Sequence, residues 1–151
     1  MRCKGQSLCF EASARFQYCC EGTVLLVLIP VAGIVASKSS LQGLHSMLSN
    51  LTPNAAAQWM DKNSVRMKLD AGEICWVPYG WVVWTVTTGT GNSYVYDIPV
   101  FSEGLLLTSP PAVRKEISEF QVKFIDQVGS VAPWDEIGDC IRRWSERLLN
   151  Q

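Results

Sequence analysis

The chain is poor in charge and in histidine. Charged residues make up 18% of its 151 residues, the formal net charge is −1, and His45 is the only histidine. A near-neutral chain lacks the basic field that attracts nucleic acid. One histidine supplies a single imidazole ligand, and its place on an expected helix is typical of a surface residue. The sequence therefore predicts no nucleic-acid partner, no metal site and no cofactor.

The common catalytic motifs are also missing. There is no G-x-S-x-G elbow, and the glycine-rich segment TGTGN at 88–92 lacks the lysine and hydroxyl residue of a phosphate-binding loop. We interpret that segment as a hairpin loop. The carboxylates on or beside the expected strands are Asp70, Glu73, Asp97 and Glu103. Asp97 lies within a strand, where a solvent-facing edge position is expected. We therefore expect no catalytic residues.

The cysteines form no metal-ligand pair. They lie at positions 3, 9, 19, 20, 75 and 140, without a C-x2-C spacing. Reduced thiols in an intracellular protein are the favoured interpretation. The alternative treats the apolar run 23–36 as a signal-peptide core cut near Ala36, which leaves Cys75 and Cys140 to form a disulfide. That run is shorter than the twenty residues of a membrane span, so none is expected.

Apolar residues are abundant, at 48% of the chain, and one stretch carries the densest run of strand formers. It is GEICWVPYGWVVWTVT, residues 72–87. Alternation predicts strands at 73–77 and 81–87, separated by a turn at Pro78-Tyr79-Gly80. Both faces of the second strand are largely apolar, so sheet packing covers one face, and a helix or a second copy of the chain covers the face of Trp84.

The same stretch resembles the second motif of the cupin family, G-x5-P-x-G-x2-H-x3-N. Gly72, Pro78 and Gly80 match its glycine, proline and second glycine. Val83 stands at the metal-ligand histidine, and Thr87 stands at the asparagine. The first cupin motif, H-x-H with a following glutamate, has no counterpart. The resemblance implies a jelly-roll-like double sheet with an apolar, metal-free interior. It does not imply the family's metal-dependent oxygenase or isomerase chemistry.

The segments before this stretch read as strands and short helices. A turn at Glu21-Gly22 predicts a hairpin of 15–20 with 23–29, and 31–36 is expected to continue as a short strand. Leucine spacing after Ser40 predicts a helix across the sheet, and Thr52-Pro53 starts a second helix to Met60. Residues 64–69 alternate as a half-exposed strand, which has Val65, Met67 and Leu69 facing inward.

After the central stretch, 93–98 is a strand ended or placed at an edge by Pro99, and 101–108 is a last extended segment. Two amphipathic helices follow, one after Ser109-Pro110-Pro111 and one after Pro133. The predicted fold is α+β: an antiparallel β-sandwich or partial, cupin-like jelly roll with one or two inserted helices at 40–60. Its expected units are a weakly ordered leader at 1–14, a core at 15–108 and a C-terminal helical hairpin at 109–151.

Aromatic residues are the main functional signal, because tryptophan and tyrosine enrich in both pockets and partner surfaces. We predict a non-catalytic cupin-like domain that binds a partner protein, a second copy of itself or a small apolar ligand. The alternatives are a diverged metal-dependent cupin enzyme and an incomplete copy of a longer protein. The candidate binding residues are Trp76, Tyr79, Trp81, Val83, Trp84, Thr85, Tyr94 and Tyr96.

Overall fold

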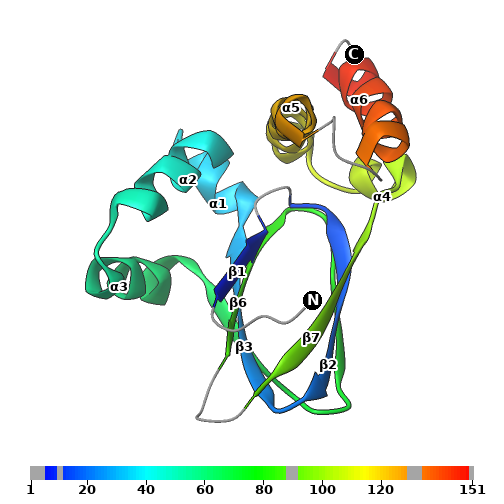
Figure 1. Ribbon diagram of the computed structural model, residues 1–151. Coiled ribbons are helices and arrows are strands. Elements are labelled where there is room, and N and C mark those ends of the chain that lie inside the picture. Colours follow the sequence, from blue (N-terminus) through cyan, green and yellow to red (C-terminus); the bar gives the residue numbers. More distant parts are fainter. Residues whose placement is uncertain (1–5, 10–11, 88–91, 129–133, 150–151) are drawn as a thin grey trace.

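The computed structural model describes residues 6–9, 12–87, 92–128 and 134–149 and has an α+β fold (Figure 1). Its strands are β1 (Gln6–Cys9), β2 (Ala14–Glu21), β3 (Thr23–Pro30), β4 (Val65–Asp70), β5 (Ile74–Val77), β6 (Trp81–Thr87) and β7 (Tyr94–Val100). Its helices are α1 (Val31–Ala36), α2 (Leu41–Asn50), α3 (Pro53–Asn63), α4 (Glu103–Leu107), α5 (Pro111–Val128) and α6 (Trp134–Leu149). The α+β prediction is confirmed.

The strands form two antiparallel sheets. The four-stranded sheet has the order β1-β6-β3-β4, and the three-stranded sheet has the order β5-β2-β7. The two sheets face each other across a shared apolar cluster, with members such as Leu26 and Val83 from one sheet and Val77 and Val95 from the other. The strand β1 lies within residues 1–14, which were expected to be a weakly ordered leader. This part of the leader belongs to the four-stranded sheet.

Turns that contain a glycine with positive φ carry the chain from one sheet to the other, and two of them follow strands of the three-stranded sheet. Gly22, with φ of +75°, follows β2 of the three-stranded sheet and precedes β3 of the four-stranded sheet. Gly80, with φ of +95°, does the same between β5 and β6. The predicted hairpin of 15–20 with 23–29 is therefore wrong, although both strands exist. A turn between sheets and a hairpin turn require the same residue types, so turn chemistry does not separate them.

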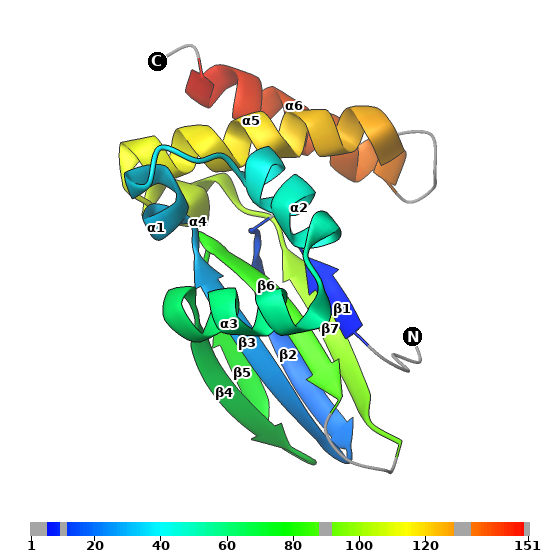
Figure 2. The same cartoon turned by 90° about the vertical axis from the view of Figure 1, so that its left-hand side faces the viewer.

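Three helices lie between β3 and β4, more than the one or two expected. The cap predictions are confirmed, because the Ser40 hydroxyl accepts a hydrogen bond from Gly43 N and the Thr52 hydroxyl accepts one from Ala55 N. Figure 2 shows that α3, rather than α2, lies across the outer face of the four-stranded sheet. Its Ala56 and Met60 pack there on Val27 of β3.

Two segments predicted as extended are helical. Residues 31–36 form α1, in which Val31 and Ile34, one turn apart, are buried in the same apolar cluster. Residues 103–107 form α4, where Ser102 caps the helix and Leu106 is buried. In α1, tertiary burial of one helical face outweighs the strand propensity of the valines and the isoleucine, whereas the leucines of α4 themselves favour a helix.

The two C-terminal helices pack against each other, and α5 also contacts α1 and α2. Val113 and Ile117 of α5 belong to the cluster that contains Leu41 and Val82, so this pair of helices covers one end of the two-sheet unit (Figure 1). Leu41 N at the start of α2 donates a hydrogen bond to Glu116 Oε1 over 2.6 Å.

The strand β4 is more exposed than its alternation predicts. Leu69 is buried, but Val65 and Met67 are exposed. β4 is an edge strand, and no described strand pairs with its outer edge. Val65 and Met67 lie on the same face of β4 as Leu69, but their place on an edge strand leaves them exposed. The edge prediction for the strand containing Pro99 is confirmed, because β7 ends the three-stranded sheet.

Candidate functional site

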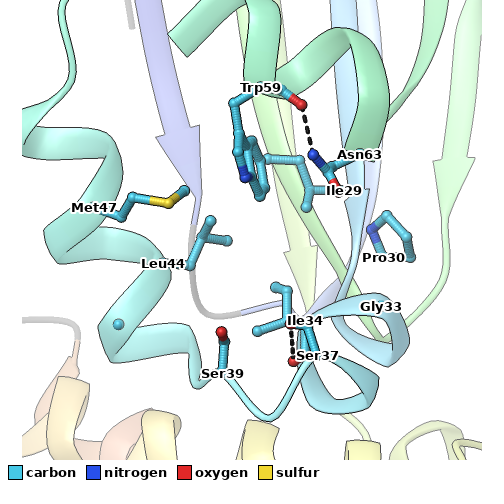
Figure 3. A pocket seen from close by; sticks show the side chains of 11 residues that line it. Ile29, Pro30, Gly33, Ile34, Ser37, Ser39, Leu44, Met47, Trp59 and Asn63 are labelled. Atoms are coloured by element: carbon cyan, nitrogen blue, oxygen red, sulfur yellow. Dashed lines mark hydrogen bonds between the residues drawn. The ribbon is translucent and has the colours of Figure 1, made fainter. Parts of the chain in front are cut away.

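A pocket of about 330 Å³ opens where β3 ends and the inserted helices begin (Figure 3). It is bounded by α1, α2, α3 and the last residues of β3. The lining residues are Ile29, Pro30, Gly33, Ile34, Ser37, Ser39, Gly43, Leu44, Met47, Trp59 and Asn63. None of them carries a charge at neutral pH. The size falls within the range of pockets that hold small molecules.

The walls of the pocket are mainly apolar. Ile34 and Leu44 are buried and form part of the cluster beneath it, while Met47 and Trp59 pack against that cluster from α2 and α3. Figure 3 shows the Trp59 indole directed toward Leu44 and Met47 across the space. An indole ring and a thioether adapt to flat or linear apolar ligands, because one offers a broad surface and the other is flexible.

The polar atoms of the pocket are few. Ser37 Oγ donates to Ile34 O over 2.8 Å, and Asn63 Nδ2 donates to Trp59 O over 2.7 Å. Each hydroxyl or amide keeps acceptor capacity beyond the bond it donates. The site therefore offers an apolar chamber with hydrogen-bonding groups, including the exposed Ser39, along its lining. This arrangement suits binding and orientation rather than proton transfer or nucleophilic attack.

The space between the two sheets is a separate environment. Val83 and Thr85 of β6 are buried there, and Trp81 packs against the same apolar cluster. Arg15 and Gln17, from β2, are also buried. Both atoms of the Gln17 amide lack a protein partner among the described residues. A polar strip therefore runs along one side of this interior.

Arg15 was not predicted to be an interior residue. Its signal was present, because Phe16 and Tyr18 share one face of β2 and strand alternation places Arg15, Gln17 and Cys19 on the other. A buried arginine requires partners, and the Arg15 guanidinium donates to Asp97 and to Ser13. Asp97 was expected to face solvent at an edge. Its place on an edge strand is confirmed, but its cross-strand partner is the buried Gln17, so its side chain, one-third exposed, lies on the interior face and pairs with Arg15.

The eight predicted binding residues do not form one site. Trp81, Val83 and Thr85 line the interior between the sheets. Trp84 lies on the opposite face of β6, in the cluster beneath α3. The helix α3 therefore covers the face of Trp84. The sequence had left either a helix or a second copy of the chain as the cover of that face. Tyr79 is buried in the cluster at the helical end, and its hydroxyl accepts a hydrogen bond from Ser102 N.

The other three, Trp76, Tyr94 and Tyr96, belong to the three-stranded sheet, and their register directs them to its outer face. None of the eight lines the pocket of Figure 3. Trp59 is the pocket's aromatic residue, and its position on a short alanine-rich helix gave no pattern that distinguishes a pocket residue from a core residue.

In the described part of the chain, thiols and carboxylates do not gather into a ligand set. Among the residues that the structure describes, no three His, Cys, Asp or Glu side chains are close enough to hold a metal ion. His45 is exposed on α2, as expected. Cys19, Cys20, Cys75 and Cys140 are free thiols. Burial raises the pKa of Cys19 and of Cys75, which disfavours their reactive thiolate forms.

No family model matches the chain, and no curated protein matches it. Within the described ranges, no helix has the length and apolar character needed to cross a membrane.

Proposed function

We propose that this chain is a non-catalytic, cupin-like jelly-roll domain that binds a small, mostly apolar ligand in the pocket formed by α1, α2, α3 and the end of β3. The two parts of this proposal have separate support. The fold assignment rests on the partial motif at residues 72–87 and on the order of strands. The ligand assignment rests on the pocket.

Strand order supports the jelly-roll assignment. From β4 to β7 the chain alternates between the two sheets, and β6 lies between β1 and β3, neither of which is its neighbour in sequence. β2 likewise lies between β5 and β7. Such interleaving is typical of the double-sheet Greek keys of jelly rolls. Val83, at the position of the family's ligand histidine, is buried in an apolar cluster.

The pocket is the single observation that carries the binding assignment. A chamber of about 330 Å³ without a charged lining residue favours a neutral, apolar ligand, since transfer of apolar surface from water drives its binding. The few hydroxyl and amide groups would accept or donate one or two hydrogen bonds and so orient the ligand. No pair of these groups has the nucleophile-and-base arrangement of a catalytic site.

A fluorescent apolar probe tests the assignment. N-phenyl-1-naphthylamine should bind the full chain saturably at one site. Gly33→Leu places a side chain beside Pro30 in the pocket and should weaken probe binding at least about tenfold. Ala32→Leu, at an exposed neighbouring position that does not line the pocket, is the matched control and should bind as the unsubstituted chain does.

Thermal unfolding of all three proteins establishes that each is folded at the titration temperature. Absence of saturable binding to the unsubstituted chain would refute the ligand assignment. Equal affinity in the Gly33→Leu and Ala32→Leu proteins would refute the location of the site.

A further inference from the structure

The polar and apolar side chains of the pocket in Figure 3 occupy different places. Three aliphatic side chains are the most buried of its lining and are 1%, 5% and 4% exposed, namely Ile29, Ile34 and Leu44. Every polar side chain that lines the pocket is exposed, and these are Ser37, Ser39 and Asn63. The pocket therefore has an aliphatic floor, and its hydrogen-bonding side chains stand at the rim.

These polar side chains stand at two opposite ends of the rim. Figure 3 shows Ser37 and Ser39 at one end, in the connection between α1 and α2, and Asn63 at the other, where α3 ends. Apolar side chains lie between the two ends, among them Leu44 and Trp59. A ligand that lies along the pocket would thus meet polar groups at both of its ends and apolar groups along its middle.

Both ends of the pocket offer hydrogen-bond acceptors. Ser37 Oγ donates its proton to Ile34 O over 2.8 Å, and Asn63 Nδ2 donates to Trp59 O over 2.7 Å. These bonds leave the lone pairs of Ser37 Oγ and Asn63 Oδ1 for a donor from outside. A hydroxyl group can donate to either atom, whereas an ether oxygen cannot.

The volume of the pocket sets the size of the ligand between these ends. The pocket holds about 330 Å³. An apolar cavity of about 150 Å³ holds one benzene ring, so this pocket has room for two rings. A flat two-ring body covers the aliphatic floor at Ile29 and Ile34, and the release of water from both surfaces favours its binding.

We propose that the ligand of this pocket is a flat, neutral two-ring compound that carries a hydroxyl group at each end. This inference rests on the proposed binding function and adds the shape and the chemistry of the ligand to it. The rings lie on the aliphatic floor, one hydroxyl donates to Ser37 Oγ, and the other donates to Asn63 Oδ1. Because both acceptors stand at an exposed rim, water competes for them, and each hydrogen bond adds a modest factor to the affinity.

Two isomers of dihydroxynaphthalene test this inference, because they have the same composition and differ only in where the hydroxyls stand. The 2,6-isomer has one hydroxyl at each end of the ring system, and the 2,3-isomer has both at one end. Each isomer is titrated against N-phenyl-1-naphthylamine bound to the full chain. The 2,6-isomer should displace the probe with about fivefold higher affinity, since only this isomer reaches both ends of the pocket.

A pair of asparagine variants locates one of the two contacts. Asn63→Ala removes the acceptor at one end and should bring the affinities of the two isomers to within about twofold of each other. Asn50→Ala is the matched control, because Asn50 Nδ2 also donates to the carbonyl four residues earlier, that of Ser46, but Asn50 does not line the pocket. This variant should keep the preference for the 2,6-isomer.

The outcomes distinguish this inference from the proposed function. If the probe does not bind saturably to the unsubstituted chain, the binding function is refuted and this inference with it. If the probe binds but the 2,6-isomer fails to displace it, or displaces it no better than the 2,3-isomer, the pocket stands and the two-ended ligand is refuted. A preference that survives Asn63→Ala, or that Asn50→Ala also abolishes, would overturn the contact with Asn63.

Discussion

Arg15 and Asp97 form an ion pair on the interior side of the three-stranded sheet. Arg15 Nη1 lies 2.7 Å from Asp97 Oδ2, and the two side chains are 1% and 33% exposed. The contact is diagonal across two strands, since Arg15 pairs with Pro99 and Asp97 pairs with Gln17 in the register of β2 and β7. The guanidinium also donates to Ser13 Oγ over 2.8 Å. The buried guanidinium of Arg15 thus has a charged partner, Asp97, at the edge of the sheet.

Loss of the Asp97 charge should destabilise the fold. Asp97→Asn removes the carboxylate charge that contacts the buried guanidinium, and the free energy of unfolding should fall by about 2–3 kcal/mol. The control is Asp61→Asn, which removes the partner of Arg66 in an exposed pair and should change stability by no more than about 0.5 kcal/mol. Urea unfolding measures both. Equal losses in the two variants would show that the interior pair contributes no more to the free energy of unfolding than the exposed pair does.

Gly22 should tolerate a methyl group worse than Gly72. Both have positive φ, +75° and +88°, so alanine is strained at either position by about 1–2 kcal/mol. At Gly22 an added Cβ would also lie 2.5 Å from Ser93 Oγ and 2.6 Å from Asn92 O, whereas nothing lies within 4 Å at Gly72. Gly22→Ala should therefore lose at least about 1 kcal/mol more than Gly72→Ala in urea unfolding. The reverse order would show that the connection between β2 and β3 differs from the one described.

The acid stability of the fold should depend on Asp70. Hydrogen bonds from the Lys68 ammonium and the Thr23 hydroxyl hold the pKa of the Asp70 carboxyl below its ordinary value. A folded-state pKa below the unfolded one stabilises the fold above the unfolded pKa, near 4, and this contribution is lost as pH falls toward the lowered value. The stability difference between the unsubstituted chain and Asp70→Asn should therefore shrink from about pH 6 to about pH 3. Urea midpoints across this range measure it, and a difference that grows on acidification would contradict the assignment.

Local structure was largely predictable from local signals. Ser40 and Thr52 precede helices that they cap, and Pro78 and Gly80 bound the turn between β5 and β6. The pattern from Trp81 to Thr87 also predicted two largely buried faces, because apolar residues occupy both sides of the strand. These signals act over a few residues and hold wherever the segment lies in the fold.

Sheet membership was not predictable in the same way. The glycine at position 22 marks a sharp turn, but only packing decides that β3 joins β6 instead of β2. The pocket has the same origin, because Ile29, Leu44 and Trp59 come from three elements and become neighbours only when the helices settle on the end of β3. Which sheet has an uncovered outer side depends on where α3 packs. Neither the composition of β2 nor that of α3 indicates where this is.

The order of strands also has a consequence for how the chain folds. Only β3 and β4 pair as neighbours in sequence among the described strands, and even they are separated by the three helices α1–α3. The ladders of β1 with β6 and of β2 with β7 join residues more than seventy positions apart, and in the other three described ladders the paired residues are 37 to 63 positions apart. Such contacts require closure of long loops before any pairing free energy is gained. During synthesis neither sheet can be completed until its last strand has left the ribosome, and folding is expected to be slow and concerted, since no early hairpin is available as a nucleus.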